Sequence, residues 1–213
     1  YSGLMRILPD GTVENDLAES VTISDDRTTY VIKISDKAQF HDGMPVTADD
    51  VIFTIQKIID PVIKSPRRGN WDGVSIEKVD DLTISFSLKQ AYAPFIYNLA
   101  TGILPKHIWK NVSGDEFSFS QFNTLPIGSG PYAVEQVQRN SGGIPNYYQL
   151  KPYGAVTGEK PFIQTFIFKF YPSELAMIQG YNDGEIESLS GISPEKMEEV
   201  SSGDAQVISS PLP

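Results

Sequence analysis

The side chains that could perform acid–base chemistry are two histidines and a few neighbouring carboxylates. They are His41, which adjoins Asp42, the isolated His107, and the pairs Asp49-Asp50 and Asp80-Asp81. A catalytic dyad or triad needs its members to converge on a nucleophile, and adjacent residues on a turn usually point apart. His41 and Asp42 are therefore interpreted as part of a turn. The two histidines are also too far apart in sequence for the short ligand spacing that most metal sites use.

Local structure explains both carboxylate pairs without invoking catalysis. Paired acids that exchange protons must face one another across a cleft. Asp50 instead follows Thr47 by three residues, the spacing of a helix capping box, and Asp49 lies in the same first helical turn. Asp80-Asp81 falls between two predicted strands and is interpreted as a turn.

The glycine-rich segment Gly128-Ser129-Gly130 has some likeness to a phosphate-binding loop. It lacks the lysine and the following helix that a P-loop needs, and it also lacks the full GxGxxG spacing. A tight turn that leads into a strand explains these glycines better. Spacing and composition thus favour a binding or structural role over an enzymatic one.

Composition excludes several further classes of protein. The 213 residues contain no cysteine and carry a net charge of −10. The absence of cysteine excludes disulfides and thiolate chemistry, and the acidic balance argues against a nucleic-acid partner. No stretch has the roughly 18 consecutive apolar residues of a membrane span. Because the chain begins at Tyr1, we expect either a removed leader or a piece of a longer protein.

The elements that would position these residues follow from hydrophobic periodicity. A hairpin is predicted over 4–17, strands over 30–34, 82–88, 132–138 and 163–171, and helices over 48–59, near 94–99, from 173 and from 193. The aromatic residues that repeat with strand period are predicted to lie in the core. They are Tyr30, Phe86, Phe166, Phe168 and Phe170. This mixture of antiparallel strands and later βαβ-like alternation predicts an α/β or α+β fold with two subdomains.

One run of residues is far more specific for a protein family than these periodic patterns are. The segment Phe40 to Phe53, FHDGMPVTADDVIF, closely resembles the signature of the family 5 extracellular solute-binding proteins, the peptide and nickel receptors of ABC importers. Six further segments resemble landmarks of that family in the same chain order. They are Tyr1 to Leu4, Asp16 to Ser20, Asp81 to Phe86, Ile103 to His107, Pro126 to Tyr132 and Gly184 to Glu187. Ser2 stands where many members carry Glu, which faces the ligand in some peptide receptors, and Glu187 replaces the usual Asp.

The resemblance implies one lobe of a type II periplasmic-binding-protein fold whose second lobe is absent from this chain. We expect a β-rich subdomain over 1–122, a mixed α/β subdomain over 123–208 and the approach to a hinge over 209–213. The resemblance also implies that much of the ligand specificity comes from the other lobe, so we expect weak or no solute binding by this lobe alone. Its candidate solute-contacting residues are Ser2, Gly3, Gly128, Ser129 and Gly130.

The implied function is capture of a peptide or similar small solute outside the cytoplasmic membrane and its delivery to ABC permease subunits. We expect a monomeric, periplasmic or extracellular protein, with a lipid anchor in a preceding segment, no cofactor, no metal and no nucleic-acid partner. One alternative is the ligand-sensing domain of a transcription regulator with the same fold. Another is an extracellular hydrolase, which would need a nucleophile beside a base, and the sequence indicates none.

Overall fold

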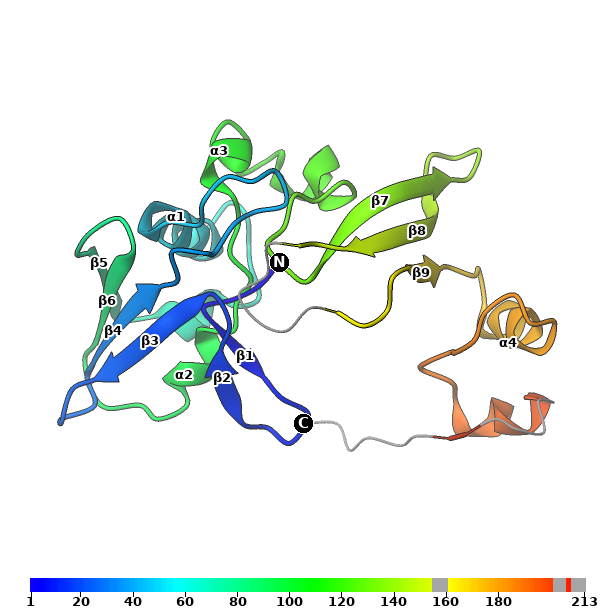
Figure 1. Ribbon diagram of the computed structural model, residues 1–213, viewed down its shortest axis with the longest axis horizontal. Coiled ribbons are helices and arrows are strands. Elements are labelled where there is room, and N and C mark those ends of the chain that lie inside the picture. Colours follow the sequence, from blue (N-terminus) through cyan, green and yellow to red (C-terminus); the bar gives the residue numbers. More distant parts are fainter. Residues whose placement is uncertain (155–160, 201–205, 208–213) are drawn as a thin grey trace. The chain divides into compact units, whose positions relative to one another are not determined.

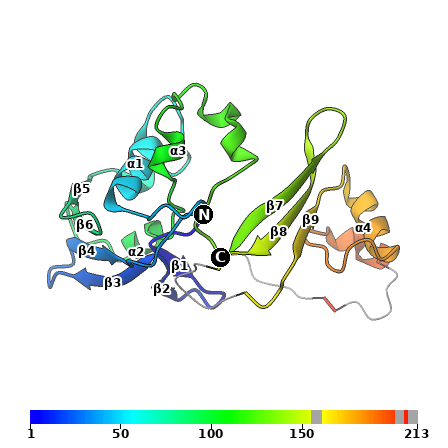
Figure 2. The same ribbon diagram turned by 45° about the horizontal axis from the view of Figure 1, so that its top comes forward.

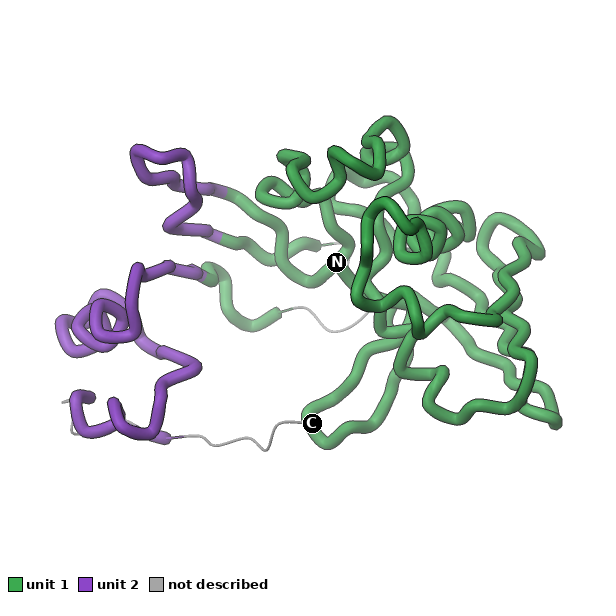
Figure 3. Tube along the Cα trace, turned by 180° about the vertical axis from the view of Figure 1, so that it is seen from behind, with its two compact units in different colours: residues 1–135, 150–166 green, residues 136–149, 167–213 purple. Residues whose placement is uncertain are grey.

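The computed structural model describes residues 1–154, 161–200 and 206–207. The chain forms two compact units, shown in Figure 3. The first contains residues 1–135 and 150–166, and the second contains 136–149 and 167–213. The subdomain boundary expected at residues 122 and 123 stays a prediction, and the expected hinge approach at 209–213 lies outside the described residues.

A four-stranded antiparallel sheet forms the centre of the first unit (Figure 1). Its strands are β3 (Ala18–Ile23), β4 (Thr29–Ile34), β5 (Val74–Lys78) and β6 (Thr83–Leu88), in the order β3-β4-β6-β5. The register places Ile32 opposite Ile84 and Tyr30 opposite Phe86. Since side chains alternate between the faces of a strand, these four buried residues share one face. The predicted core positions Tyr30 and Phe86 are therefore confirmed.

Helix α1 (Ala48–Ile59) contributes side chains to the same core as this sheet (Figure 2). Thr47 is its N-cap, and the Asp50 carboxylate accepts hydrogen bonds from the Thr47 backbone N–H at 2.9 Å and its hydroxyl at 2.8 Å. The helix ends before Asp60, because the residue that precedes a proline avoids helical backbone angles. On this helix Thr54 is buried, whereas Ile59 near its end is 41% exposed.

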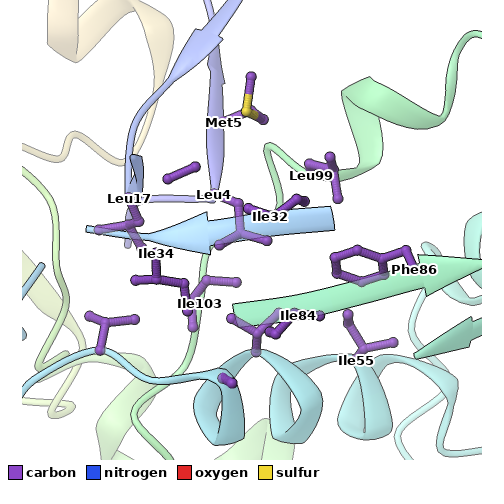
Figure 4. Packing of buried hydrophobic residues seen from close by; sticks show 14 of the residues in the cluster. Leu4, Met5, Leu17, Ile32, Ile34, Ile55, Ile84, Phe86, Leu99 and Ile103 are labelled. Carbon is purple, nitrogen blue, oxygen red and sulfur yellow. The ribbon is translucent and has the colours of Figure 1, made fainter. Parts of the chain in front are cut away.

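The core joins segments that are distant in sequence. Figure 4 shows side chains from β4, β6, α1 and the segments around Leu4, Leu17 and Ile103 meeting there. Ile32, Ile34, Phe40, Ile84 and Phe86 have no exposed surface. Full burial of such a side chain contributes about 1.5–3 kcal/mol, so this cluster is the main source of stability for the first unit.

Short elements complete the first unit around this core. They are the antiparallel pair β1 (Met5–Ile7) and β2 (Val13–Asn15), the helices α2 (Phe95–Asn98) and α3 (Lys106–Trp109), and the 3-10 turns η1 (Arg68–Trp71), η2 (Phe117–Phe119) and η3 (Gln121–Asn123). The predicted hairpin over 4–17 and the predicted short helix near Pro94 are both confirmed.

A three-stranded sheet follows, in the order β7-β8-β9. Its strands are β7 (Tyr132–Arg139), β8 (Pro145–Pro152) and β9 (Phe166–Lys169). Strand β9 is shorter than the predicted strand over 163–171. The prediction that Phe168 and Phe170 are core residues is wrong, because they are 47% and 54% exposed. Phe166 is half-buried against the Tyr132 ring. A period of two places residues on one face but does not supply an element to cover that face.

The second unit contains two helical elements. Helix α4 (Glu174–Asn182) begins at Ser173, whose hydroxyl accepts the Ala176 backbone N–H at 3.2 Å, as the sequence predicts. The element that begins at Ser193 is the 3-10 helix η4 (Pro194–Glu199). None of the helices in the described part combines the length and the apolar character needed to span a bilayer. The expected mixture of strands and helices, an α/β (α+β) fold class, is confirmed.

Candidate functional site

The site residues predicted near the N-terminus and in the glycine-rich loop lie side by side. The Ser2 backbone N–H donates a hydrogen bond of 3.2 Å to the Ser129 hydroxyl oxygen, although 127 positions separate the two residues. Both side chains are buried, at 8% and 6% exposure. The Ser2 carbonyl accepts the backbone N–H of Ile103 at 2.9 Å, so the backbone at Ser2 is held on both sides.

Gly3 is a glycine because the backbone passes very close to another segment. A Cβ atom at this position would lie 2.7 Å from the carbonyl carbon of Ala100 and 2.9 Å from the Leu99 oxygen. Contacts below 3.0 Å with backbone atoms cannot be relieved by rotating a side chain. The Gly3 carbonyl accepts the Leu17 backbone N–H at 3.1 Å, which fixes this strand-like segment beside β3.

His41 also binds the glycine-rich loop. Its Nδ1 accepts the Gly128 backbone N–H at 3.2 Å, and its Nε2 lies 2.9 Å from the Gly130 carbonyl oxygen. The His41 backbone N–H also donates to the Gly128 carbonyl at 2.7 Å. The two ring bonds together require the neutral tautomer with hydrogen on Nε2, because a carbonyl can only accept and an amide N–H can only donate.

The environment of His41 favours this neutral form. Burial lowers its pKa below 6.5, outweighing the opposite effect of the bond to the Gly130 carbonyl. The sequence predicts only a turn at His41. No spacing rule connects it to a loop 87 positions later, so sequence reasoning missed this contact.

Asp42 points to a different partner from its neighbour, as expected for adjacent residues on a turn. Its Oδ2 lies 2.7 Å from Nε2 of His107. The description of His107 as isolated is therefore wrong, because the fold brings together two residues 65 positions apart. Burial opposes ionisation of Asp42, but hydrogen bonds from His107 and from the Met44 N–H lower its pKa below 3.8 overall.

The two carboxylate pairs have the local roles that the sequence predicts. Asp50 caps α1 as described above, and Asp80 accepts the backbone N–H of Leu82 at 2.8 Å in the turn between β5 and β6. Across residues 1–154, 161–200 and 206–207, no group of three or more His, Asp or Glu side chains could hold a metal ion.

An open cavity of about 490 Å³ adjoins the paired segments. Ser2, Gly3 and Gly130 line it, whereas Gly128 and Ser129 do not. The remaining lining residues include Arg6 and Asp16, so the wall carries one charge of each sign. A volume of this size falls in the range of small-molecule sites. Whether the five predicted residues contact a solute stays a prediction.

Residues 12–212 match the family described as "Bacterial extracellular solute-binding proteins, family 5 Middle". This chain belongs to that family. Its members are binding proteins and not enzymes, and they are found outside the cytoplasm. The resemblance stated from the FHDG segment and the six other landmarks is therefore confirmed.

Individual relatives agree with this assignment. The oligopeptide-binding protein AppA of Bacillus subtilis is 32% identical over 87% of this chain and 34% of its own length. The solved ABC transporter substrate-binding protein CtaP of Listeria monocytogenes is 34% identical over 94% of this chain and 40% of that one, with a TM-score of 0.77. NikZ of Campylobacter jejuni, solved with Ni(L-His), is 30% identical over 87% of this chain and 36% of that one, with a TM-score of 0.76.

The structural similarity confirms the type II periplasmic-binding-protein fold expected from the sequence. The chain spans about a third of the length of the curated relatives it matches, 34% in the case of AppA.

Proposed function

We propose that this chain forms part of the substrate-binding component of an ABC importer, which captures a peptide or a similar small solute and delivers it to the permease. The supporting observation is the bond between Ser2 and Ser129, beside a cavity lined by Ser2, Gly3 and Gly130. The names of AppA and CtaP support the same role.

The chemistry of the cavity supports a peptide as the solute. A peptide carries a charge of each sign at its two ends, and Arg6 and Asp16 supply the complementary charges on the lining. Arg6 also forms a 3.0 Å ion pair with Glu14, and this exposed pair leaves the guanidinium close to solvent. Rim charges of this kind contribute more to orientation and association rate than to affinity. NikZ, solved with Ni(L-His), makes a metal–amino-acid complex the second candidate.

In this proposal the described residues supply one wall of the site, and the rest of the full-length protein supplies the other. A solute that binds the closed arrangement more tightly than the open one then shifts the protein toward closure. We further propose that the protein acts as a monomer in the periplasm or outside the cell, attached by lipid through a preceding segment. None of the three relatives above is named as a transcription regulator, so the importer role is favoured over a sensor domain.

Calorimetry on the full-length protein with di- to pentapeptides and with a nickel–histidine complex tests the proposal. We expect micromolar or tighter binding of a peptide. Gly130→Phe places a ring at a cavity position where a Cβ meets no atom within 4 Å, so it should raise the peptide Kd about tenfold or more. Gly69→Phe is the matched control, because its Cβ also meets no atom within 4 Å and it does not line this cavity. Failure of every peptide to bind would refute the peptide assignment.

A further inference from the structure

We infer that His41 is the positioning residue of this site: its imidazole holds the 128–130 loop in the one conformation that fixes Ser2 and forms the cavity wall. The inference rests on the proposed function, because it assumes that this loop borders the solute. It assigns a role to a histidine that the sequence places only in a turn.

The first step is the contact between His41 and the loop. Three hydrogen bonds join them: the backbone N–H to the Gly128 carbonyl at 2.7 Å, Nδ1 to the Gly128 N–H at 3.2 Å, and Nε2 to the Gly130 carbonyl at 2.9 Å. A loop with two glycines has more conformational freedom than other sequences. Hydrogen bonds at both ends of the loop remove that freedom. The imidazole ring supplies two of these three hydrogen bonds, and the His41 backbone supplies the third.

The second step leads from the loop to the cavity. Ser129 lies between the two glycines that His41 holds, and its hydroxyl accepts the Ser2 N–H at 3.2 Å. Gly130, which bonds to Nε2, itself lines the cavity. A change in the loop at His41 is therefore transmitted to Ser2 and Gly130 through a continuous set of hydrogen bonds.

Tyr153 holds the His41 ring in place. The Tyr153 ring packs on it with 4.9 Å between centroids. Tyr153 is fixed in turn, because its hydroxyl donates to the Phe40 carbonyl at 2.7 Å and its N–H donates to the Pro131 carbonyl at 2.9 Å. The ring thus has a defined orientation in which each nitrogen meets one backbone group of the loop.

This arrangement makes the loop sensitive to protonation. A proton on Nδ1 would place two donors, the imidazolium N–H and the Gly128 N–H, against each other and break that bond. The charged side chain that acts on the ring is the carboxylate of Asp42, which favours the added proton. The Tyr153 phenol is the remaining titratable neighbour. Burial of the ring keeps it neutral near pH 7.

The test uses the full-length protein with His41→Phe, His41→Gln and the matched control His107→Phe. Phenylalanine keeps a ring against Tyr153 but loses both ring bonds. The amide of glutamine offers an acceptor and a donor and does not titrate. His107 is the other histidine of the chain, and among the described residues its side chain contacts Asp42 and the Phe40 ring and not the 128–130 loop.

Two readouts are measured: amide hydrogen exchange of Gly128 and Ser2 by NMR, and the peptide Kd between pH 5 and pH 8. We expect His41→Phe to speed both exchange rates and to raise the Kd, each about tenfold, whereas His107→Phe leaves them unchanged. Wild-type affinity should fall toward pH 5. His41→Gln should keep near-wild-type affinity at pH 7.5 and lose this pH dependence.

A folded His41→Phe protein with wild-type exchange and Kd would overturn the inference. If His41→Phe does not fold, the pH dependence of His41→Gln decides. The inference would be overturned if this variant lost as much peptide affinity toward pH 5 as the wild type does. If the wild-type protein binds no peptide, the proposed function fails, and the exchange rates of Gly128 and Ser2 still decide the role of His41.

Discussion

The Asp50 carboxylate accepts the backbone N–H of Lys106 at 2.8 Å, across 56 positions of sequence. The same side chain caps helix α1 through Thr47, and it is buried at 5% exposure. One carboxylate therefore joins the start of α1 to the start of α3, and its loss would leave donors from both segments without their acceptor.

The first prediction compares the two adjacent acids of this helix. Asp50→Ala should lower the free energy of unfolding by about 3 kcal/mol, because hydrogen bonds to a charged group are strong and the Lys106 and Thr47 N–H groups lose their partner. Asp49→Ala should cost no more than about 1 kcal/mol, since its 2.9 Å pair with Lys78 is exposed. Urea denaturation of both variants measures the difference, and equal losses would contradict it.

The second prediction concerns the close packing at Gly3. Gly3→Ala should destabilise the protein by about 2 kcal/mol, because the added methyl group meets the backbone of Ala100 at 2.7 Å. Gly69→Ala is the control, since a Cβ there meets no atom within 4 Å. Thermal unfolding should show a clear drop in Tm for the first variant and little change for the second. A Gly3→Ala protein as stable as the control would show that the segment can move aside.

The third prediction concerns the bond between Ser2 and Ser129. Ser129→Ala should cost about 1–3 kcal/mol, because the buried Ser2 N–H loses its acceptor. Ser120→Ala removes a comparable hydroxyl, which accepts the Phe122 N–H at 3.3 Å within a short turn, and should cost less. Urea denaturation measures the loss in free energy of unfolding for each variant. Faster hydrogen exchange of the Ser2 amide in Ser129→Ala, but not in Ser120→Ala, would show that the loss arises at the Ser2–Ser129 bond.

The fourth prediction is a pH dependence of stability caused by His41. Above pH 6.5 the ring is neutral in both the folded and the unfolded chain, and its contribution to the free energy of unfolding is fully present. As the pH falls below 6.5, the unfolded chain takes up a proton before the folded one, because burial lowers the folded pKa. Stability should therefore fall with a slope of at most about 1.4 kcal/mol per pH unit.

Denaturation of the wild type and His41→Phe between pH 7.5 and pH 4.5 measures this slope. The variant should have a flatter profile over that window. The contribution of Asp42 should be lost only below pH 3.8, because its folded pKa is lowered, so the two effects are separated on the pH axis. A wild-type profile that stays flat between pH 6.5 and pH 4.5 would refute the assignment to His41.

The elements of the first unit were predictable from sequence because their signals are local. Alternation over 30–34 and 82–88, the Thr47 cap and the Asp60-Pro61 terminus each concern a few neighbouring residues, and the structure has all of them. Phe168 and Phe170 show the limit of such signals. Their period places them on one face, but burial depends on a covering element that the pattern does not contain.

The candidate site was predictable only in part for the same reason. The resemblance to family landmarks selected Ser2 and Ser129, and the structure brings them into contact. The contact of His41 with Gly128 and that of Asp42 with His107 join residues 87 and 65 positions apart. Such pairs are set by the packing of the whole sheet and helix, and neither partner carries a spacing pattern that points to the other.

The tight fit of Gly3 against Ala100 limits which positions of the cavity wall can be changed. In the proposed function, position 3 cannot be varied to change solute selectivity, because even one methyl group has no room there. Arg6 and Asp16 line the same cavity, so substitutions at these two positions can reshape its wall while the close packing at Gly3 stays unchanged.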